Sequence, residues 1–407
     1  MRDIPERSKV QALLSKLNQA LAAHDINKIL ALFLEDCYWR DLVAFTWNIK
    51  TMEGNTAVGD MLSSQLAYTK PENFKLHFDR EVSSENGVTS AWITFETTVA
   101  RCEGQIRIKE EKIWTLLTSM VELKGHEEPL GTNRPMGTKH GSNGNQLTWQ
   151  EQQEKEKTEL GSKVQPYVVV IGGGQGGIAL GARLRQLDVP TIIIERNDRA
   201  GDSWRNRYKS LCLHDPIWYD HLPYLPFPKN WPVFSPKDKI GDWLEMYTKV
   251  MELNYWTRSC VTKAYYDNAT QEWVVEVHRD SEKITLRPKQ LVFATGMSGK
   301  ANIPNFNGQD TFKGDQQHSS SHPGPEGYDG KKAVVIGSNN SAHDICAALY
   351  ENNVDVTMVQ RSSTHIVRSE SLIEHGLSAL YSEEAVAKGI TTELADLTFA
   401  SIPYAIL

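Results

Sequence analysis

A glycine-rich stretch between two apolar runs, residues 167–195, constrains the fold more than any other part of the chain. It reads YVVVIGGGQGGIALGARLRQLDVPTIIIE. The β-branched run Tyr167–Ile171 predicts a buried strand, which leads directly into Gly172, Gly174 and Gly177 in G-x-G-x-x-G spacing. A strand that ends in this spacing predicts a tight turn at which the backbone comes close to a pyrophosphate.

The residues after the glycines complete the pattern. A helix is expected over Ile178–Leu187, and its first N–H groups would face the phosphates. A second apolar strand over Thr191–Ile194 ends at Glu195, where a carboxylate accepts hydrogen bonds from an adenosine ribose. The alternative is a glycine-rich turn with Glu195 as a solvated acid, which leaves the glycine spacing unexplained. The nucleotide-binding residues predicted here are Gly172, Gly174, Gly176, Gly177 and Glu195.

Length, charge and cysteine content narrow the class of protein. A sequence of 407 residues suggests roughly two or three domains. The net charge of −7 offers no positive excess for a nucleic acid backbone, so nucleic acid is not an expected partner. Five separated cysteines without a C-x-x-C pair fit reduced thiols. No run approaches the about 18 apolar residues of a membrane span. We therefore expect a cytoplasmic protein.

The first part of the sequence predicts an α+β unit. Apolar residues at helical spacing mark a helix within residues 8–23, and a second short helix is expected over Ile26–Leu34. Alternating strands follow, with a turn at residues 84–87. The expected strands are Phe74–Asp79, Thr89–Ala100 and Gln105–Leu117.

This order of a long helix followed by strands resembles the cone-shaped NTF2-like (SnoaL-like) domain over roughly residues 8–125. In that family the pocket of the cone sometimes carries an acid or a histidine as a base. Trp39, Arg40, Asp41 and Asp36 would lie near such a pocket, but solvated or structural charges explain them as well, and no catalysis is assigned to them. Such a domain ahead of a redox enzyme would suit secondary metabolism.

A linker and a second nucleotide-binding unit are also predicted. Residues 126–146 are rich in Gly, Pro and polar residues, and Leu147–Leu160 reads as an exposed helix. Further on, a strand over Ala333–Ile336, a helix over Ser341–Tyr350 and a strand over Val354–Gln360 form a second βαβ pattern. The binding residues predicted in it are Gly337, Asn339, Ser341, Ala342, Arg361 and Ser362.

The two units differ in the charge that follows the second strand. Asn339 tolerates positive φ and Ala342 allows close packing, so the second turn can form without its full glycine set. Arg361 fits a 2′-phosphate, which the carboxylate of Glu195 would repel. The first unit should therefore bind FAD and the second NADPH. The alternative is an exposed Arg361 at a strand edge.

Further motifs resemble the flavin-containing monooxygenases, especially the plant YUCCA branch and the related Baeyer–Villiger enzymes. These motifs are GDSW at residues 201–204, LCLHDPIW at 211–218, LPYLPFP at 222–228, and the F-x-G-x-x-x-H pattern from Phe312 to His318. Asp202, Ile217 and His322 depart from the residues usual in that family. The further cofactor contacts that the resemblance implies are Asp202, Trp204, His214, Ala294, Thr295 and Gly296, with the Trp204 loop and His214 against the flavin.

The resemblance implies hydride transfer from NADPH to FAD, reaction of the reduced flavin with O2, and oxygenation of a small molecule by a C4a-hydroperoxyflavin. No catalytic side chain is identified because the flavin does the chemistry, and no metal is expected. A homodimer is left open. A disulfide reductase is disfavoured because no paired cysteine motif exists.

Four segments are expected. They are an NTF2-like domain (1–125), a linker and connecting helix (126–163), an FAD-binding Rossmann-type domain (164–330) and a partial NADPH-binding domain of the same type (331–407). The expected strand–helix alternation stops after Arg361, so the second α/β domain is predicted to be incomplete and the protein to be shortened at its C-terminus. The alternative function is a truncated, non-catalytic accessory protein that binds flavin or nucleotide.

Overall fold

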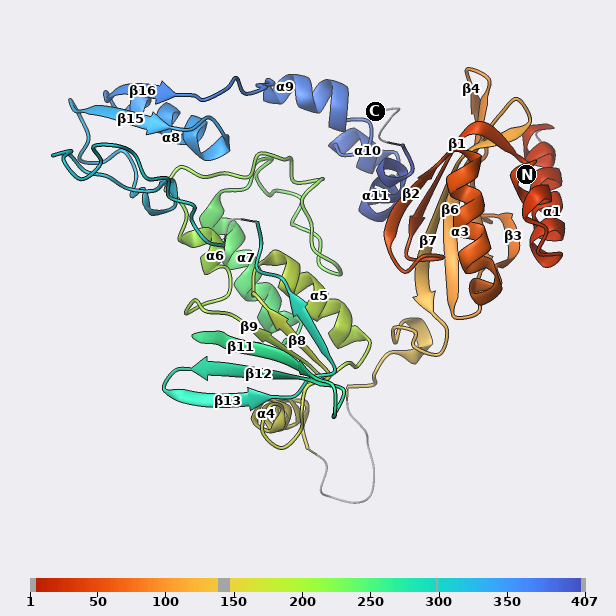
Figure 1. Cartoon of the computed structure of the whole chain (residues 1–407), viewed down its shortest axis with the longest axis horizontal. Helices are drawn as coiled ribbons and strands as arrows, with labels where there is room; N and C mark the ends of the chain where they lie inside the picture. The colour runs from red at the N-terminus through yellow and green to blue at the C-terminus, as the bar shows by residue number, and fades with distance from the viewer. Residues whose placement is uncertain (1–4, 138–146, 298, 404–407) are drawn as a thin grey trace. The chain divides into compact units, whose positions relative to one another are not determined.

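The computed structural model describes residues 5–137, 147–297 and 299–403. The protein forms two compact units (Figure 1). The first contains the described residues up to Glu128 together with those from Glu383 onward, and the second contains Pro129–Ser382. Both mix helices with sheets, as the predicted α/β content requires. No helix in the described ranges is long and apolar enough to cross a bilayer.

The first unit is built on a seven-stranded sheet in the order β2-β1-β7-β6-β5-β3, with β4 paired to β5. The pair β1–β7 is parallel, and the other pairs are antiparallel. The strands are β1 (Phe33–Leu42), β2 (Ile49–Glu53), β3 (Glu72–Leu76), β4 (Ser83–Glu85), β5 (Val88–Glu96), β6 (Ala100–Lys109) and β7 (Lys112–Leu123).

Helices α1 (Pro5–Ala22), α2 (Ile26–Leu30) and α3 (Gly54–Thr69) share an apolar core with this sheet (Figure 1). The predicted stripe of α1 is buried, with Leu14 and Leu17 almost fully covered. Burial of such a stripe is what stabilises an amphipathic helix on a sheet.

Three predictions in this unit were wrong. The predicted strand Thr89–Ala100 ends at Glu96, where a turn closed by the Thr97 N–H and the Ala100 carbonyl leads into β6. The second helix ends at Leu30 rather than Leu34, because Phe33 already begins β1. The predicted strand Gln105–Leu117 covers the end of β6 and the start of β7. The chain reverses between these strands at Glu110 and Glu111, which both have positive φ. Glutamates lack the Asn or Gly signal of such a turn, so the sequence pattern does not reveal it. Strands β1 and β2 and helix α3 were not predicted.

The acids near the supposed pocket of this unit have structural roles or lie in solvent. Asp41 is fully buried, and its carboxylate accepts hydrogen bonds from the backbone N–H of Phe45 and Thr46 and from the Thr118 hydroxyl. Trp39 donates its indole N–H to the same Thr118 hydroxyl. Asp36 is exposed. Asp41 therefore fixes the loop between β1 and β2.

The C-terminal helices α10 (Glu383–Ala387) and α11 (Thr392–Ala400) belong to the first unit. Arg107 on β6 donates from Nη1 to the Ser401 carbonyl at 2.7 Å and from Nη2 to the Ser401 hydroxyl at 2.8 Å. Burial lowers the pKa of Arg107. The segment 331–407 is thus shared between the two units, and its assignment to a nucleotide-binding domain stays a prediction.

The second unit contains a parallel sheet in the order β10-β9-β8-β14. Its strands are β8 (Val168–Ile171), β9 (Thr191–Ile194), β10 (Tyr255–Trp256) and β14 (Gln290–Phe293). Helices α5 (Gln175–Gln186) and α7 (Lys237–Val250) form one apolar core with this parallel sheet. An antiparallel sheet forms a second apolar core with the same parallel sheet. That second sheet consists of β11 (Ser259–Asp267), β12 (Glu272–Arg279) and β13 (Glu282–Leu286). Strands β11 and β12 pair antiparallel as a hairpin, with Asp267 opposite Glu272.

The predicted connecting helix is α4 (Trp149–Glu159), which starts at a capping box of Thr148 and Glu151. The second βαβ unit is also present: β15 (Lys332–Ile336), α8 (Asn340–Glu351) and the parallel strand β16 (Asp355–Val359). Shorter helices are α6 (Asp202–Arg205), α9 (Ser369–Leu372) and the π-helical turn Ile373–Leu377.

Candidate functional site

The first turn, residues 172–177, requires its glycines for close backbone contact. Gly172 has φ +108°, and a Cβ there would lie 2.3 Å from the Ala294 carbonyl oxygen. A Cβ on Gly177 would lie 2.0 Å from the Gly172 carbonyl oxygen. Gly176 has nothing within 4 Å of its Cβ position. The turn therefore packs against the segment after β14 and leaves open space at the start of α5, where N–H groups attract phosphate.

Glu195 is buried and engaged within the protein. Its Oε2 accepts the Gly173 N–H at 2.9 Å, and its Oε1 accepts the backbone and side-chain N–H groups of Asn197, both at 2.8 Å. Glu195, which follows β9, thus holds the first turn through the Gly173 N–H. Contact of this carboxylate with a ribose stays a prediction.

The loop after β9 brings Trp204 to the first turn. Trp204 donates its indole N–H to Gln175 Oε1 at 3.2 Å, at the first residue of α5. The Asp202 carboxylate pairs with Arg205 at 2.8 Å and accepts the Arg199 N–H at 3.0 Å. Asp202 therefore stabilises this loop. Contact of Asp202 or Trp204 with a cofactor stays a prediction.

Two further predicted residues after β14, Thr295 and Gly296, are exposed, and Gly296 has φ +72°. Thr295 continues the segment that lies over Gly172, since its backbone N would be 3.1 Å from a Cβ there. The structure therefore brings Ala294 and Thr295 to the first turn.

The second turn, residues 337–342, repeats the first with other residues. Gly337 has φ +130°, and Ala342 is buried at the position of the last glycine. Asn339 caps α8 by accepting the Asn340 N–H on its side chain at 2.9 Å. The turn forms with a single glycine because Asn339, like Gly174, has extended backbone geometry.

Backbone hydrogen bonds show which residues of the two turns occupy equivalent positions, and they correct the predicted equivalence of Glu195 and Arg361. The Gly172 N–H donates to the Ile194 carbonyl, and the Gly337 N–H donates to the Val359 carbonyl, each at 2.9 Å. Glu195 thus corresponds to Gln360, one residue before Arg361. The counterpart of Arg361 is Arg196. The comparison of Glu195 with Arg361 was therefore wrong by one position. The second βαβ unit has the neutral Gln360 where the first has Glu195, and in both units an arginine comes next.

His214 lies at the second turn. Its Nε2 is 3.1 Å from Asp344 Oδ2, and its Nδ1 is 3.0 Å from Asn340 Nδ2. Tyr208 donates to the same Asp344 carboxylate at 2.6 Å. Burial and then this hydrogen bond raise the pKa of Tyr208. Sequence reasoning missed Tyr208, Asp344 and Asn340 because no local pattern links residues more than 120 positions apart.

A comparison with known families identifies the group of proteins to which the chain belongs. A family model described as pyridine nucleotide-disulphide oxidoreductase matches residues 169–400, which is more than half of the chain. The chain belongs to this family. All five of its cysteines are free, so neither unit contains a disulphide.

Curated relatives of the chain are named as indole-3-pyruvate monooxygenases. The chain is 30% identical over 243 residues to indole-3-pyruvate monooxygenase YUCCA1 of Oryza sativa subsp. japonica, covering 60% of this chain and 58% of that protein. It is 33% identical over 210 residues to probable indole-3-pyruvate monooxygenase YUCCA7 of Arabidopsis thaliana, covering 50% and 49%. The chain therefore spans about half the length of the curated relatives it matches.

Solved structures give weaker matches of the same kind. A flavin-containing monooxygenase from Stenotrophomonas maltophilia is 22% identical with a TM-score of 0.46, covering 55% of this chain and 68% of that one. A complex of OTEMO with FAD and NADP is 26% identical with a TM-score of 0.42, covering 48% and 39%. The curated relatives, by their names as monooxygenases, are enzymes.

The remaining predicted residues lie around the second turn or in the segment before it. Arg361 and Ser362 are exposed, and Ser341 is in the first turn of α8. His322 is buried against Tyr328, with Gln317 Nε2 at 3.1 Å from its Nδ1. No group of three or more metal-ligating side chains occurs within the described ranges.

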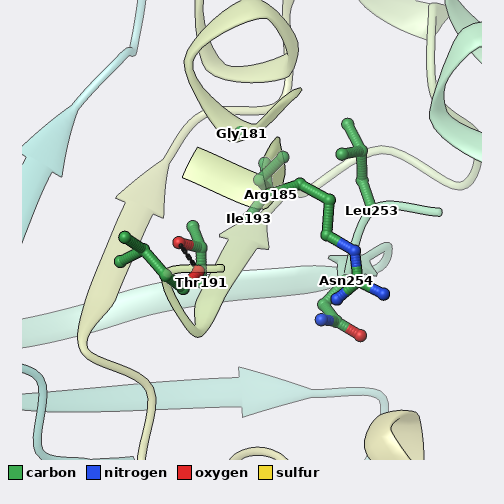
Figure 2. A pocket seen from close by; sticks show the side chains of 7 residues that line it. Gly181, Arg185, Thr191, Ile193, Leu253 and Asn254 are labelled. Atoms are coloured by element: carbon green, nitrogen blue, oxygen red, sulfur yellow. Dashed lines mark hydrogen bonds between the residues drawn. The ribbon is translucent and has the colours of Figure 1, made fainter. Parts of the chain in front are cut away.

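A pocket at the far end of α5 does not serve this site (Figure 2). Its volume of about 10 Å³ holds no more than one water molecule. Arg185 and Asn254 in its wall donate to Glu156 of α4. Burial alone would raise the pKa of Glu156, but these hydrogen bonds hold it below its usual value. The pocket therefore marks where α4 packs. Its lining consists of Gly181, Arg185, Val189, Thr191, Ile193, Leu253 and Asn254.

Proposed function

We propose that this protein is an FAD- and NADPH-dependent monooxygenase that transfers one oxygen atom of O2 to a small organic substrate. The observation that supports it best is that one loop, residues 202–214, contacts both turns. Trp204 bonds Gln175 at the first turn, and His214 contacts Asn340 at the second. Hydride transfer needs two cofactors held at a fixed separation, and a shared loop can provide that.

The residues at each turn fit the cofactor proposed for it. At the first turn, open space beside Gly176 at the start of α5 suits the FAD pyrophosphate. At the second, neutral Gln360 removes the repulsion that a carboxylate would exert on a 2′-phosphate, and exposed Arg361 can pair with it. When bound, the flavin supplies hydride acceptance and oxygen activation. The protein binds both cofactors and orients them.

The proposal has further parts that rest on resemblance. The first unit would be an NTF2-like domain, with the domain limits predicted from the sequence. The protein would act in the cytoplasm, in secondary metabolism, and a homodimer is compatible with this role. The oxygen-activating route would be that of the flavin monooxygenases.

A second candidate, a non-catalytic accessory protein that binds flavin or nucleotide, is favoured by one observation. The β15–β16 sheet has two strands, and three of its apolar side chains are largely uncovered: Val334, Ile336 and Val359 are 63%, 58% and 47% exposed. A two-stranded sheet with one bare face is weakly stabilised. The second βαβ unit would then bind NADPH poorly.

Purified protein, supplied with FAD, distinguishes the two candidates. The monooxygenase should retain a flavin spectrum that NADPH bleaches without air, and air should restore the spectrum. A colourless protein that neither binds added FAD nor consumes NADPH would contradict the first candidate. Flavin binding without bleaching by NADPH would support the accessory role.

A further inference from the structure

We propose that Tyr255 and Thr364 are positioning residues that hold the two turns in the peptide orientation that receives a nucleotide phosphate. Each would do so by donating a hydroxyl hydrogen bond to the carbonyl of the second residue of its turn. The inference rests on the proposed function for the identity of the nucleotides. The hydrogen bonds themselves are features of the protein alone.

At the first turn the donor is Tyr255 of β10. Its hydroxyl donates to the Gly173 carbonyl oxygen at 2.6 Å. The same hydroxyl lies 2.1 Å from where a Gly173 Cβ would be, so the tyrosine ring fills the space that a side chain would need. Burial, then the charges of Glu195 and Asp202, raise the pKa of Tyr255. The phenol therefore stays protonated and remains a donor.

This hydrogen bond determines where the next N–H points. In a trans peptide the carbonyl of one residue and the N–H of the next point in opposite directions. Because Tyr255 and Glu195 engage the C=O and N–H of Gly173, the Gly174 N–H must point away from the sheet. Gly174 is the N-cap of α5, and its N–H has no acceptor in the part of the chain that the structure describes. An anion in front of the helix would supply that acceptor.

At the second turn a different element makes the same contact. The Thr364 hydroxyl, from the loop after β16, lies 2.6 Å from the Ser338 carbonyl oxygen and 2.8 Å from Ser338 Oγ. A hydroxyl has one hydrogen and can also accept, so Thr364 donates to the carbonyl and accepts from the Ser338 side chain. The Asn339 N–H is thereby directed away from Thr364.

The recurrence makes a chance contact an insufficient explanation. The backbone alignment of Gly172 with Gly337 makes Gly173 and Ser338 equivalent. The two donors differ in residue type and come from different elements, yet both engage this one carbonyl. The turn residues complement their donors: glycine gives room to the tyrosine ring, and serine adds a second hydrogen bond to the smaller threonine. Because the donors are a tyrosine and a threonine from unrelated elements, similar packing of one donor residue does not explain why both carbonyls are engaged.

Crossed variants of the full-length protein test the proposal. Tyr255→Phe and Thr364→Val remove the hydroxyls and keep the shapes. We expect Tyr255→Phe to weaken FAD binding about 3- to 10-fold and leave NADP+ binding unchanged, and Thr364→Val to do the reverse. Thr364→Ser should restore binding. Tyr350→Phe and Thr357→Val, at exposed positions of the second βαβ unit, are the matched controls.

A second measurement does not depend on the cofactors. Hydrogen–deuterium exchange of ligand-free protein should rise in residues 172–177 of Tyr255→Phe and in residues 337–342 of Thr364→Val, each without a change in the other turn. If wild type binds both cofactors and the variants match it in affinity and exchange, the proposal is overturned. If wild type binds neither, the proposed function fails, and the phosphate role fails with it. Equal weakening of both cofactors by either variant would show a general structural effect and also overturn it.

Discussion

The Tyr208 hydroxyl donates to the Asp344 carboxylate over 2.6 Å, and this hydrogen bond connects the loop after the first turn to the helix of the second. Tyr208 is buried in an apolar cluster with Ile345 and Leu349 of the same helix. His214 contacts the same carboxylate. The loop that contacts Gln175 is thus also part of the core of the second βαβ unit, which couples the two turns.

Replacement of Tyr208 by phenylalanine should remove this connection and keep the ring in place. We expect a loss of about 1 kcal/mol in the free energy of unfolding, because one buried hydrogen bond is lost. Urea denaturation measures it. Tyr350→Phe, in which the ring is largely exposed, should change stability much less. Equal stability of Tyr208→Phe and wild type would show that apolar packing alone holds this loop.

The first turn offers a matched pair of glycine substitutions. A Cβ at Gly177 would lie 2.0 Å from a backbone oxygen, whereas Gly176 has open space. Gly177→Ala should therefore destabilise the cofactor-free protein by about 1–3 kcal/mol. Gly176→Ala, in the first turn of α5, should leave stability unchanged or raise it by up to about 1 kcal/mol. Chemical denaturation of both variants checks this. Similar effects would contradict the close approach at Gly177.

The charge after β16 should decide between NADPH and NADH. Arg361→Ala is expected to weaken NADPH binding roughly 10- to 100-fold, because a charge-assisted pair with the 2′-phosphate is lost, and to change NADH binding little. Gln360→Glu should act in the same direction by repulsion. Titration calorimetry with both nucleotides measures the ratio, with Arg196→Ala as the control. Equal weakening of NADPH and NADH by Arg361→Ala would exclude the 2′-phosphate contact.

His322 should make stability depend on pH. Among the described residues its buried Nε2 has no hydrogen-bond partner, and burial holds the pKa of His322 below the usual 6.5. The unfolded state therefore takes up a proton first as the pH falls, so folding stability decreases from about pH 6.5 downward until the pKa of the folded state is reached. His322→Phe should remove this decrease, whereas His365→Gln, at an exposed position, should retain it. Thermal denaturation between pH 5 and 8 gives the comparison, and parallel profiles for wild type and His322→Phe would refute it.

Much of the second unit was predictable because its signals are local. Strands β8 and β9 are short apolar runs, the glycines stand at fixed spacing, and β15, α8 and β16 repeat the order. The first unit was predicted less well. Its sheet begins in a run, Phe33–Leu42, where apolar and charged residues follow neither a strand nor a helix period.

The sequence by itself determined the two glycine turns and the strands that lead into them, since backbone geometry and apolar burial are decided by neighbours along the chain. Only the tertiary structure decided which residues meet at those turns. It made Gln360 rather than Arg361 the equivalent of Glu195, and it brought Tyr255 to Gly173 and Asp344 to Tyr208. Hydrogen bonds between distant segments depend on how strands pair and how a helix packs, and spacing in the sequence does not encode either directly.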